Sequence, residues 1–312
     1  MTSPRPTYHA RPKRRREPAP RRQPPRAHAW VGAQRLVVGV SFDRGSAQAL
    51  ERGHELARAL GLELAVVHVL PDDDVRHRSE AVRRAFAHAT RTAIQRWALS
   101  VCAIALPTDS VRVRFGDVAK HLVHVARRHS GELLVIGGRS DDGLAPGART
   151  AEIVRQSHGP VLLAGLRTGA RQIVAATDLA SEGVPVVRRA AEYAKRLCRR
   201  VSVIHNVDHG SQPPLLAPIE RLSLAENLDR LRSIVRELDA VDDATVTRED
   251  IAAAGILRIA RVRDADIVVV GVRPDIGSTS WSILASAQRS ILLVPLPPQF
   301  AVERPSLETG AS

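Results

Sequence analysis

The residues best suited to chemistry lie near the C-terminal end of the chain, where two glycines flank an arginine. An apolar run ends at Gly271 and is followed by Arg273. A second glycine, Gly277, precedes Ser278 and Thr279 and opens a helix-like stretch that leads into another apolar run. A strand that feeds a helix N-terminus through glycines presents backbone N–H groups to an anion. The spacing therefore predicts a phosphate or other anion site here.

An earlier stretch of the chain follows the same order. An apolar run ends at Gly137, Arg139 stands two residues later, and Gly147 precedes a helix-like segment and a final apolar run. The second glycine is followed by Ala148 in place of a hydroxyl residue, so this copy has one hydrogen-bond donor fewer. The sequence thus predicts two related sites, with the later one better equipped.

The remaining polar residues do not assemble a catalytic centre. No nucleophile elbow, P-loop lysine motif or H-E-x-x-H motif is present. His68 and His205 end matched apolar runs, and we expect each to be a partly buried ring bonded to the backbone. The acidic runs 72–74 and 242–243 are expected in turns and loop caps, not around a metal. We therefore predict no catalytic residue and no metal ligand.

The composition is that of a globular protein with aliphatic cores. Of 312 residues, 44% are hydrophobic but only 3% aromatic. No apolar run approaches the roughly 20 residues needed to span a bilayer, and no secretory signal is visible, so a cytoplasmic location without membrane contact is expected. Cys102 and Cys198 lack metal-type spacing and are expected as reduced core or near-core residues.

Positive charge is concentrated at the N-terminus. The first 30 residues hold nine Lys or Arg against one Glu, and the whole chain has a net charge of +13. This Pro- and Arg-rich stretch cannot form a core, so residues 1–33 are predicted to be a disordered basic tail. Residues 1–30 could bind a polyanion weakly through counterion release, or could be a solvated tail or the result of a start codon placed too early.

Beyond the tail, strand-like and helix-like segments alternate regularly. The expected strands are 36–40, 62–70, 111–115, 133–137, 161–165, 172–177, 201–207, 244–249, 267–271 and 291–295. The expected helices are 46–60, 79–105, 118–129, 148–156, 185–197, 216–238, 251–262 and one starting at 278. Matched landmarks recur about 130 to 137 positions apart, which indicates an internal duplication.

This order predicts an α/β protein with two tandem, doubly wound, parallel five-stranded sheets. The predicted organisation is a first domain over 34–168, a second over 169–297 and a C-terminal tail over 298–312. Ligands of such sheets bind at the carboxyl ends of the strands, at the switch point of the topology.

The pattern resembles the universal stress protein family in its tandem two-domain form. The resemblance covers about residues 34–166 and 171–297. It rests on VVGVSFDRGSAQAL and IVAATDLASEGVPVV at the two domain starts, on VVHV and VIHN in the second strands, and on the two strand–glycine–helix–strand endings. The family implies the strand order 3-2-1-4-5 of an adenine nucleotide alpha hydrolase-like fold, and an adenine-nucleotide pocket in members that bind ATP with Mg²⁺.

Domain 1 departs from the family's phosphate motif, which is G-x-x-G, nine residues, then G-[ST]. After Gly137, Ser140 replaces the second glycine, only six residues intervene, and the motif ends in Gly147 without the hydroxyl residue. The family's strand-end aspartate falls at Ser41, and the position that borders adenine falls at Val69. Asp141 and Asp142 add repulsion toward phosphates, so this site, with Arg139 nearby, is expected to be degenerate.

Domain 2 keeps more of the family's pattern. Gly277 and Ser278 end its motif intact, although Pro274 replaces the second glycine and only two residues intervene. The strand-end aspartate is Asp178, and the position beside adenine is Asn206. Gly271, Arg273 and Thr279 complete the candidate site. Ser278 as a simple helix cap is the competing interpretation.

Three functions follow from this interpretation. The first is a non-enzymatic stress-response or regulatory binding protein, with an empty domain 1 and with an adenine nucleotide or anion in domain 2. The second is an ATP-binding, slowly hydrolysing switch, and the third is a nucleic-acid accessory protein that acts through the N-terminal tail. The apolar final strands 161–165 and 291–295 are expected to pair within the chain as a pseudo-dimer, which leaves a further homodimer open.

Overall fold

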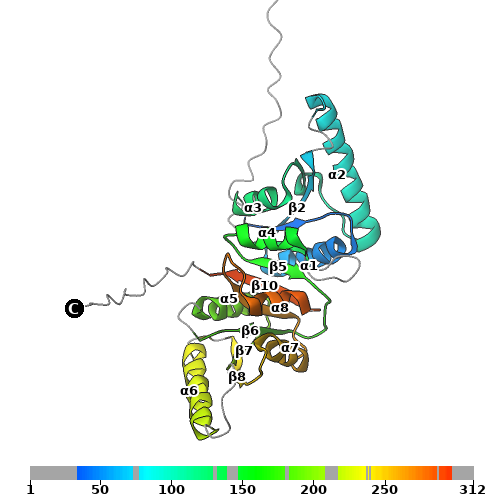
Figure 1. The fold of residues 1–312 in the computed structure, drawn as a ribbon. Coiled ribbons are helices and arrows are strands. Elements are labelled where there is room, and N and C mark those ends of the chain that lie inside the picture. The colour runs from blue at the N-terminus through cyan, green and yellow to red at the C-terminus, as the bar shows by residue number, and fades with distance from the viewer. Residues whose placement is uncertain are drawn as a thin grey trace, which may run out of the picture. The chain divides into compact units, whose positions relative to one another are not determined.

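The computed structural model describes residues 34–72, 77–128, 132–138, 147–179, 183–207, 217–236, 238, 240–286 and 288–296. These residues belong to one compact unit of the chain. They form an α/β fold in which strands and helices alternate along the sequence (Figure 1). None of the described helices is both long and apolar enough to cross a membrane.

The first half of the chain contains five strands and the helices between them. Its elements are β1 (Arg35–Gly39), α1 (Arg44–Leu60), β2 (Glu63–Leu70), α2 (Glu80–Cys102), η2 (Thr108–Ser110), β3 (Val111–Phe115), α3 (Val118–Arg128), β4 (Leu133–Gly137), α4 (Ala148–Gln156) and β5 (Val161–Ala164). All five strands run parallel, in the order β3-β2-β1-β4-β5.

The second half repeats this arrangement. Its elements are β6 (Gln172–Ala176), α5 (Gly183–Arg196), β7 (Arg200–Asn206), α6 (Ala217–Val235), β8 (Val241–Thr247), α7 (Ala252–Val262), β9 (Ile267–Val272), α8 (Ser278–Ser286) and β10 (Ser290–Pro295). The strand order β8-β7-β6-β9-β10 is again 3-2-1-4-5. The predicted fold class is therefore confirmed in both halves.

The elements form where local sequence and burial agree. In β1, Leu36, Val37 and Val38 are almost completely buried, as expected for strands that helices cover on both faces. Helix α1 begins at a capping aspartate, because the Ser46 N–H donates to Asp43 Oδ1 over 2.6 Å. The helix ends where the following residue adopts a left-handed conformation.

Two predictions from the sequence are wrong. Cys198 is exposed, because it stands in a left-handed turn after α5 with φ of 51° and does not enter the core. The acidic pair Asp242 and Asp243 lies within β8, which starts three residues before the predicted strand. An edge strand tolerates acidic residues because one of its sides lacks a neighbouring strand, and both carboxylates form ion pairs there, with Arg200 and Arg263.

A single antiparallel pairing joins the two halves. Strand β10 lies beside β5, with Ile291 opposite Leu163 and Leu292 opposite Leu162, so the two five-stranded sheets form one sheet of ten strands (Figure 1). The backbone edges of β5 and β10 are thereby hydrogen-bonded to each other. The strands at the two ends of the combined sheet are β3 and β8.

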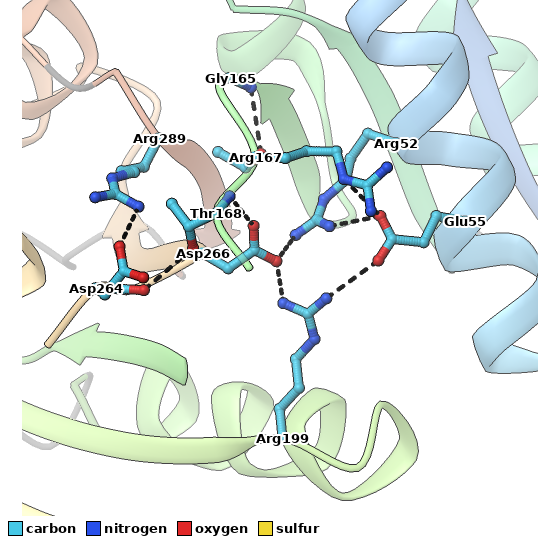
Figure 2. Close-up of polar contacts among 10 residues, drawn as sticks. Arg52, Glu55, Gly165, Arg167, Thr168, Arg199, Asp264, Asp266 and Arg289 are labelled. Atoms are coloured by element: carbon cyan, nitrogen blue, oxygen red, sulfur yellow. Dashed lines mark hydrogen bonds and ion pairs between the residues drawn. The ribbon is translucent and has the colours of Figure 1, made fainter. Parts of the chain in front are cut away.

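A polar cluster lies at the same junction. Arg52 of α1 and Arg199, just before β7, both reach the carboxylate of Asp266, which precedes β9 (Figure 2). Arg199 and Arg167 also reach Glu55 of α1. Because these residues come from both halves and from the segment between them, the cluster ties the two halves together with charged groups.

Candidate nucleotide or anion site

The predicted site residues follow strands that meet at the switch point of each half. In the second half, β6 lies directly beside β9, with Val174 opposite Val268. Asp178 comes two residues after β6, and the loop from Arg273 to Gly277 comes directly after β9. Because parallel strands end at the same edge of a sheet, these segments lie at the edge where ligands of such folds bind.

The start of α8 is open to solvent in the second half. Gly277, Ser278 and Thr279 are all exposed, and a Cβ placed on Gly277 would meet no atom within 4 Å. The first N–H groups of a helix lack partners within the helix and carry partial positive charge. The Ser280 hydroxyl is used internally, since it donates to the Gly271 carbonyl over 3.0 Å and fixes the helix start against β9.

The two glycines at the strand ends are explained by packing. A Cβ on Gly271 would come within 2.7 Å of a Leu296 methyl group and 3.0 Å of a Val186 methyl group. A Cβ on Gly137 would come within 2.8 Å of the Gly45 backbone at the start of α1. These glycines allow the strand ends to approach neighbouring segments, so close ligand approach is not needed to account for them.

Asn206 performs a structural task at the end of β7. Its amide nitrogen donates to the Glu249 carbonyl over 3.0 Å, and its amide oxygen accepts from the Thr247 hydroxyl and the Glu249 N–H. These bonds fasten the loop after β8 to β7. The side chain that was predicted to border adenine is therefore occupied by protein groups, which leaves the exposed carboxylate of Asp178 as the more accessible of the two.

The first half presents a different arrangement at the equivalent edge. The Ser41 hydroxyl donates to Asp43 over 2.5 Å, and its N–H donates to the Ser46 hydroxyl over 2.7 Å, so Ser41 belongs to the cap of α1. Burial raises the pKa of the Asp43 carboxyl, but the hydrogen bonds from Ser41 and Ser46 outweigh it and lower the pKa. Val69 is buried.

The structure describes only some of the other candidate site residues in the first half. Gly147 is exposed and begins α4 without a side-chain cap. Arg139, Ser140, Asp141 and Asp142 lie outside the described residues. The predicted repulsion between these carboxylates and a phosphate therefore stays a prediction.

The two histidines are held by the backbone, as predicted. His68 Nδ1 lies 2.7 Å from the Val40 carbonyl, and His205 Nδ1 lies 2.9 Å from the Thr177 carbonyl. Each ring thus ties the end of its strand to the neighbouring strand. In the part of the chain that the structure describes, no group of three or more His, Cys, Asp or Glu is placed to hold a metal ion.

The sequence did not single out Phe42 or Leu179, which occupy matching positions after β1 and β6. Both adopt left-handed backbone conformations, with φ of 63° and 60°. The Phe42 ring packs edge-on against His68 and Trp97, with centroids 5.1 and 5.7 Å apart. Positive φ at bulky residues has no sequence signal, because glycine and asparagine are the residues that normally mark it.

Comparison with known proteins agrees with this fold. The profile of the universal stress protein family matches the chain twice, over residues 32–165 and 169–295. The chain therefore belongs to the universal stress protein family, with two family units in tandem, and this resemblance, predicted from the sequence, is confirmed.

Solved structures resemble the whole tandem. The crystal structure of a universal stress protein from Archaeoglobus fulgidus is 14% identical, with a TM-score of 0.60, and covers 84% of this chain and 98% of its own. A functionally unknown protein from Pseudomonas aeruginosa is also 14% identical, with a TM-score of 0.59 and coverage of 86% and 94%. At this level of identity the similarity is one of fold.

Proposed function

We propose that this universal stress protein is a non-enzymatic binding protein for stress response or regulation, with one degenerate and one functional ligand site. The functional site is in the second half and takes an adenine nucleotide or a related anion. The first half acts as its structural partner.

One observation carries this proposal: the edge between β6 and β9 has an exposed carboxylate and an exposed hydroxyl group at the positions where the edge between β1 and β4 has Ser41 and Ala148. Asp178, Ser278 and Thr279 are exposed; Ser41, the counterpart of Asp178, is exposed too, but it has no carboxylate and its hydroxyl donates to Asp43 within the cap of α1. The counterpart of Ser278 is Ala148, which has no hydroxyl group to donate.

The exposed residues at this edge would contact the phosphates and the other polar groups of an adenine nucleotide. The N–H groups at the start of α8 and the hydroxyls of Ser278 and Thr279 would hold phosphate oxygens, and Arg273 would add positive charge from the preceding loop. The Asp178 carboxylate would accept a hydrogen bond from an amino or hydroxyl group of the ligand. Mg²⁺, when bound with the phosphates, would offset their charge.

We propose binding without chemistry on that ligand, because the histidine at this edge is held by the backbone. A hydrolytic reaction needs a base within hydrogen-bond reach of a water molecule at the phosphate. His205, the histidine at this edge, has its Nδ1 at the Thr177 carbonyl. We therefore propose that the protein acts by binding this ligand and by the effect of the binding on a partner.

Isothermal titration of ATP, ADP and AMP with Mg²⁺ tests the proposal. We expect one binding site per chain, and we expect Ser278→Ala to weaken binding about 10- to 100-fold, the value of a hydrogen bond to a charged group. Asp178→Ala should weaken binding as well. The matched control is Ser41→Ala in the first half, which should leave the affinity unchanged.

Three other outcomes would contradict the proposal. Two equal sites per chain would mean that the first half also binds. Steady release of phosphate at a rate that Ser278→Ala lowers would favour the hydrolysing switch. Absence of heat with all three nucleotides, together with absence of co-purified nucleotide, would remove the ligand from the second half.

A further inference from the structure

We infer that the first half of the chain carries a nucleic-acid-binding surface on α3 and the edge strand β3, which recognises the phosphate backbone. This basic face consists of Arg112, Arg114, Lys120, His124, Arg127 and Arg128. It is independent of the nucleotide site proposed above and belongs to the folded domain, not to the N-terminal tail.

The register of β3 places its arginines toward α3. Val111 and Val113 are buried in the core that includes Ile94 and Ala98 of α2. Because successive side chains of a strand point to opposite faces, Arg112 and Arg114 point to the other face of the sheet. Arg114 is exposed there at the outer edge of the ten-stranded sheet.

The outer surface of α3 continues this positive charge. Ala119, Leu122, Val125 and Ala126 are buried against the sheet. The opposite side of the helix carries exposed basic residues at helical spacing, namely Lys120, His124, Arg127 and Arg128. Asp117 stands at the start of the helix, and its carboxylate accepts the Lys120 backbone N–H over 2.8 Å.

The basic groups lie close enough to affect one another. Partial desolvation lowers the pKa of the exposed His124, and the charges of Arg128, His121, Arg114 and Arg127 lower it further. Helix α3 packs on β2, the neighbour of β3, so its side chains and those of Arg112 and Arg114 lie on the same face of the sheet. Among the residues that the structure describes, Arg114, Lys120, Arg127 and Arg128 form no ion pair with an acidic side chain.

The duplicated second half provides an internal comparison. Its edge strand β8 and helix α7 occupy the equivalent positions, and α7 has the same length of 11 residues as α3. There two of the three exposed arginines at α7 have acidic partners: Arg258 pairs with Glu249, and Arg263 pairs with Asp243. The same scaffold therefore has most of its positive charge paired with carboxylates at one end of the sheet and unpaired at the other, so the fold does not require the charge on α3.

The chemistry of this face favours a nucleic acid over other polyanions. Four of its six residues are arginines, which bind phosphate oxygens through two parallel hydrogen bonds. Most apolar residues of α3 are buried against the sheet, so the helix offers no apolar face for insertion into a membrane interface. A protein interface would need an apolar centre, which the exposed side of α3 does not provide.

The dimensions also fit a phosphate backbone. An 11-residue helix is roughly 16 Å long, at about 1.5 Å per residue. This length equals the rise of about five base pairs at about 3.4 Å each, so several phosphates of one strand can lie along the face. Because the contacts go to phosphates, binding should depend strongly on salt and little on base sequence.

Fluorescence anisotropy of a labelled DNA duplex of about 20 base pairs tests this surface in the full-length chain. The test variant combines Arg114→Gln, Arg127→Gln and Arg128→Gln, all at exposed side chains. The control variant combines Arg258→Gln, Arg261→Gln and Arg263→Gln on the equivalent surface, with the same loss of charge. Circular dichroism and thermal unfolding confirm that both variants are folded.

We expect the test variant to bind about 10-fold or more weakly at about 50 mM salt, and the slope of log K against log salt to fall by about 2 to 3. The control variant should differ from the unchanged chain by less than about threefold. An unaltered affinity in the test variant would assign binding to the N-terminal tail and overturn the proposal. Equal losses in both variants, absence of duplex binding, or binding to anionic lipid vesicles without duplex binding would overturn it as well.

Discussion

The Arg52 guanidinium donates to the Asp266 carboxylate over 2.5 Å, although the two residues are 214 positions apart in the chain. The Arg52 and Asp266 side chains are only 1% and 2% exposed. A second cation, Arg199, contacts the same carboxylate. The Asp266 carboxylate has both of its cations only when both halves are in place, because Arg52 comes from the first half and Arg199 from the second, so this pair couples the second half to the first.

Removing one partner of this pair should cost much of the protein's stability. Arg52→Ala leaves Asp266 buried with a single cation, and we expect the free energy of unfolding to fall by about 3 kcal/mol. Urea denaturation measures the change. Arg84→Ala is the control, because Arg84 pairs with Glu80 on the exposed surface of α2 and should contribute less than about 0.5 kcal/mol. Equal losses in the two variants would show that the buried pair has no special role.

The same pair should make stability sensitive to acid. Burial raises the pKa of Asp266, but Arg52 and Arg199 more than offset it, so the folded-state pKa is lowered. A lowered pKa gives stability that is fully present above the unfolded pKa of about 3.9 and lost as the pH falls through the folded value.

Asp266→Asn tests this expectation through the pH dependence of unfolding. The difference in unfolding free energy between the variant and the unchanged chain should be largest above about pH 5 and should shrink as the pH falls toward about 3. Asp229→Asn, at an exposed pair with Arg232, is the control and should show little dependence on pH. A difference that stays constant with pH would contradict the lowered pKa.

The alternation of apolar runs and turns was sufficient to predict the order of the strands and helices, because strands covered on both faces leave continuous apolar segments. The same alternation could not predict that Asp266 would form an ion pair with Arg52, because nothing in the sequence distinguishes these two residues from other charged residues beside apolar runs. Nor could it show that Asn206 is used by protein groups, because its partners come from a loop about 40 residues later. Whether a candidate site residue can bind a ligand depends on the accessibility of its side chain. A sequence pattern does not show this accessibility.

The position of Cys198 is explained by comparing it with the equivalent position in the first half of the chain. Its counterpart after α1 is Gly61, and both residues have left-handed backbones, with φ of 51° and 67°. Glycine adopts this conformation without strain, whereas a residue with a Cβ is strained by about 1 kcal/mol. The helix-like segment before Cys198 suggested a core position, but the need to end α5 places this residue in a surface turn.

Exchanging these residues should change stability in opposite directions. Gly61→Ala introduces the strain and should lower the free energy of unfolding by about 1 kcal/mol. Cys198→Gly removes strain but makes the unfolded chain more flexible, so a smaller gain of about 0.5 kcal/mol is expected. Thermal unfolding of both variants measures the two changes. A Cys198→Gly protein that unfolds at a lower temperature than the unchanged chain would mean that the thiol makes a stabilising contact.

The two cysteines should also differ in reactivity. Burial, together with the charge of Glu51, raises the pKa of the Cys102 thiol to about 11. At about pH 8 only about one molecule in a thousand then has this residue as the reactive thiolate. Cys198 is exposed, so iodoacetamide should modify it first and leave Cys102 largely untouched.

Peptide mass analysis after timed alkylation distinguishes the sites, and the urea-unfolded chain, in which both should react, is the control. Faster alkylation of Cys102 in the folded protein would show that α2 opens at its C-terminal end, where this thiol donates to the Ala47 carbonyl over 3.8 Å.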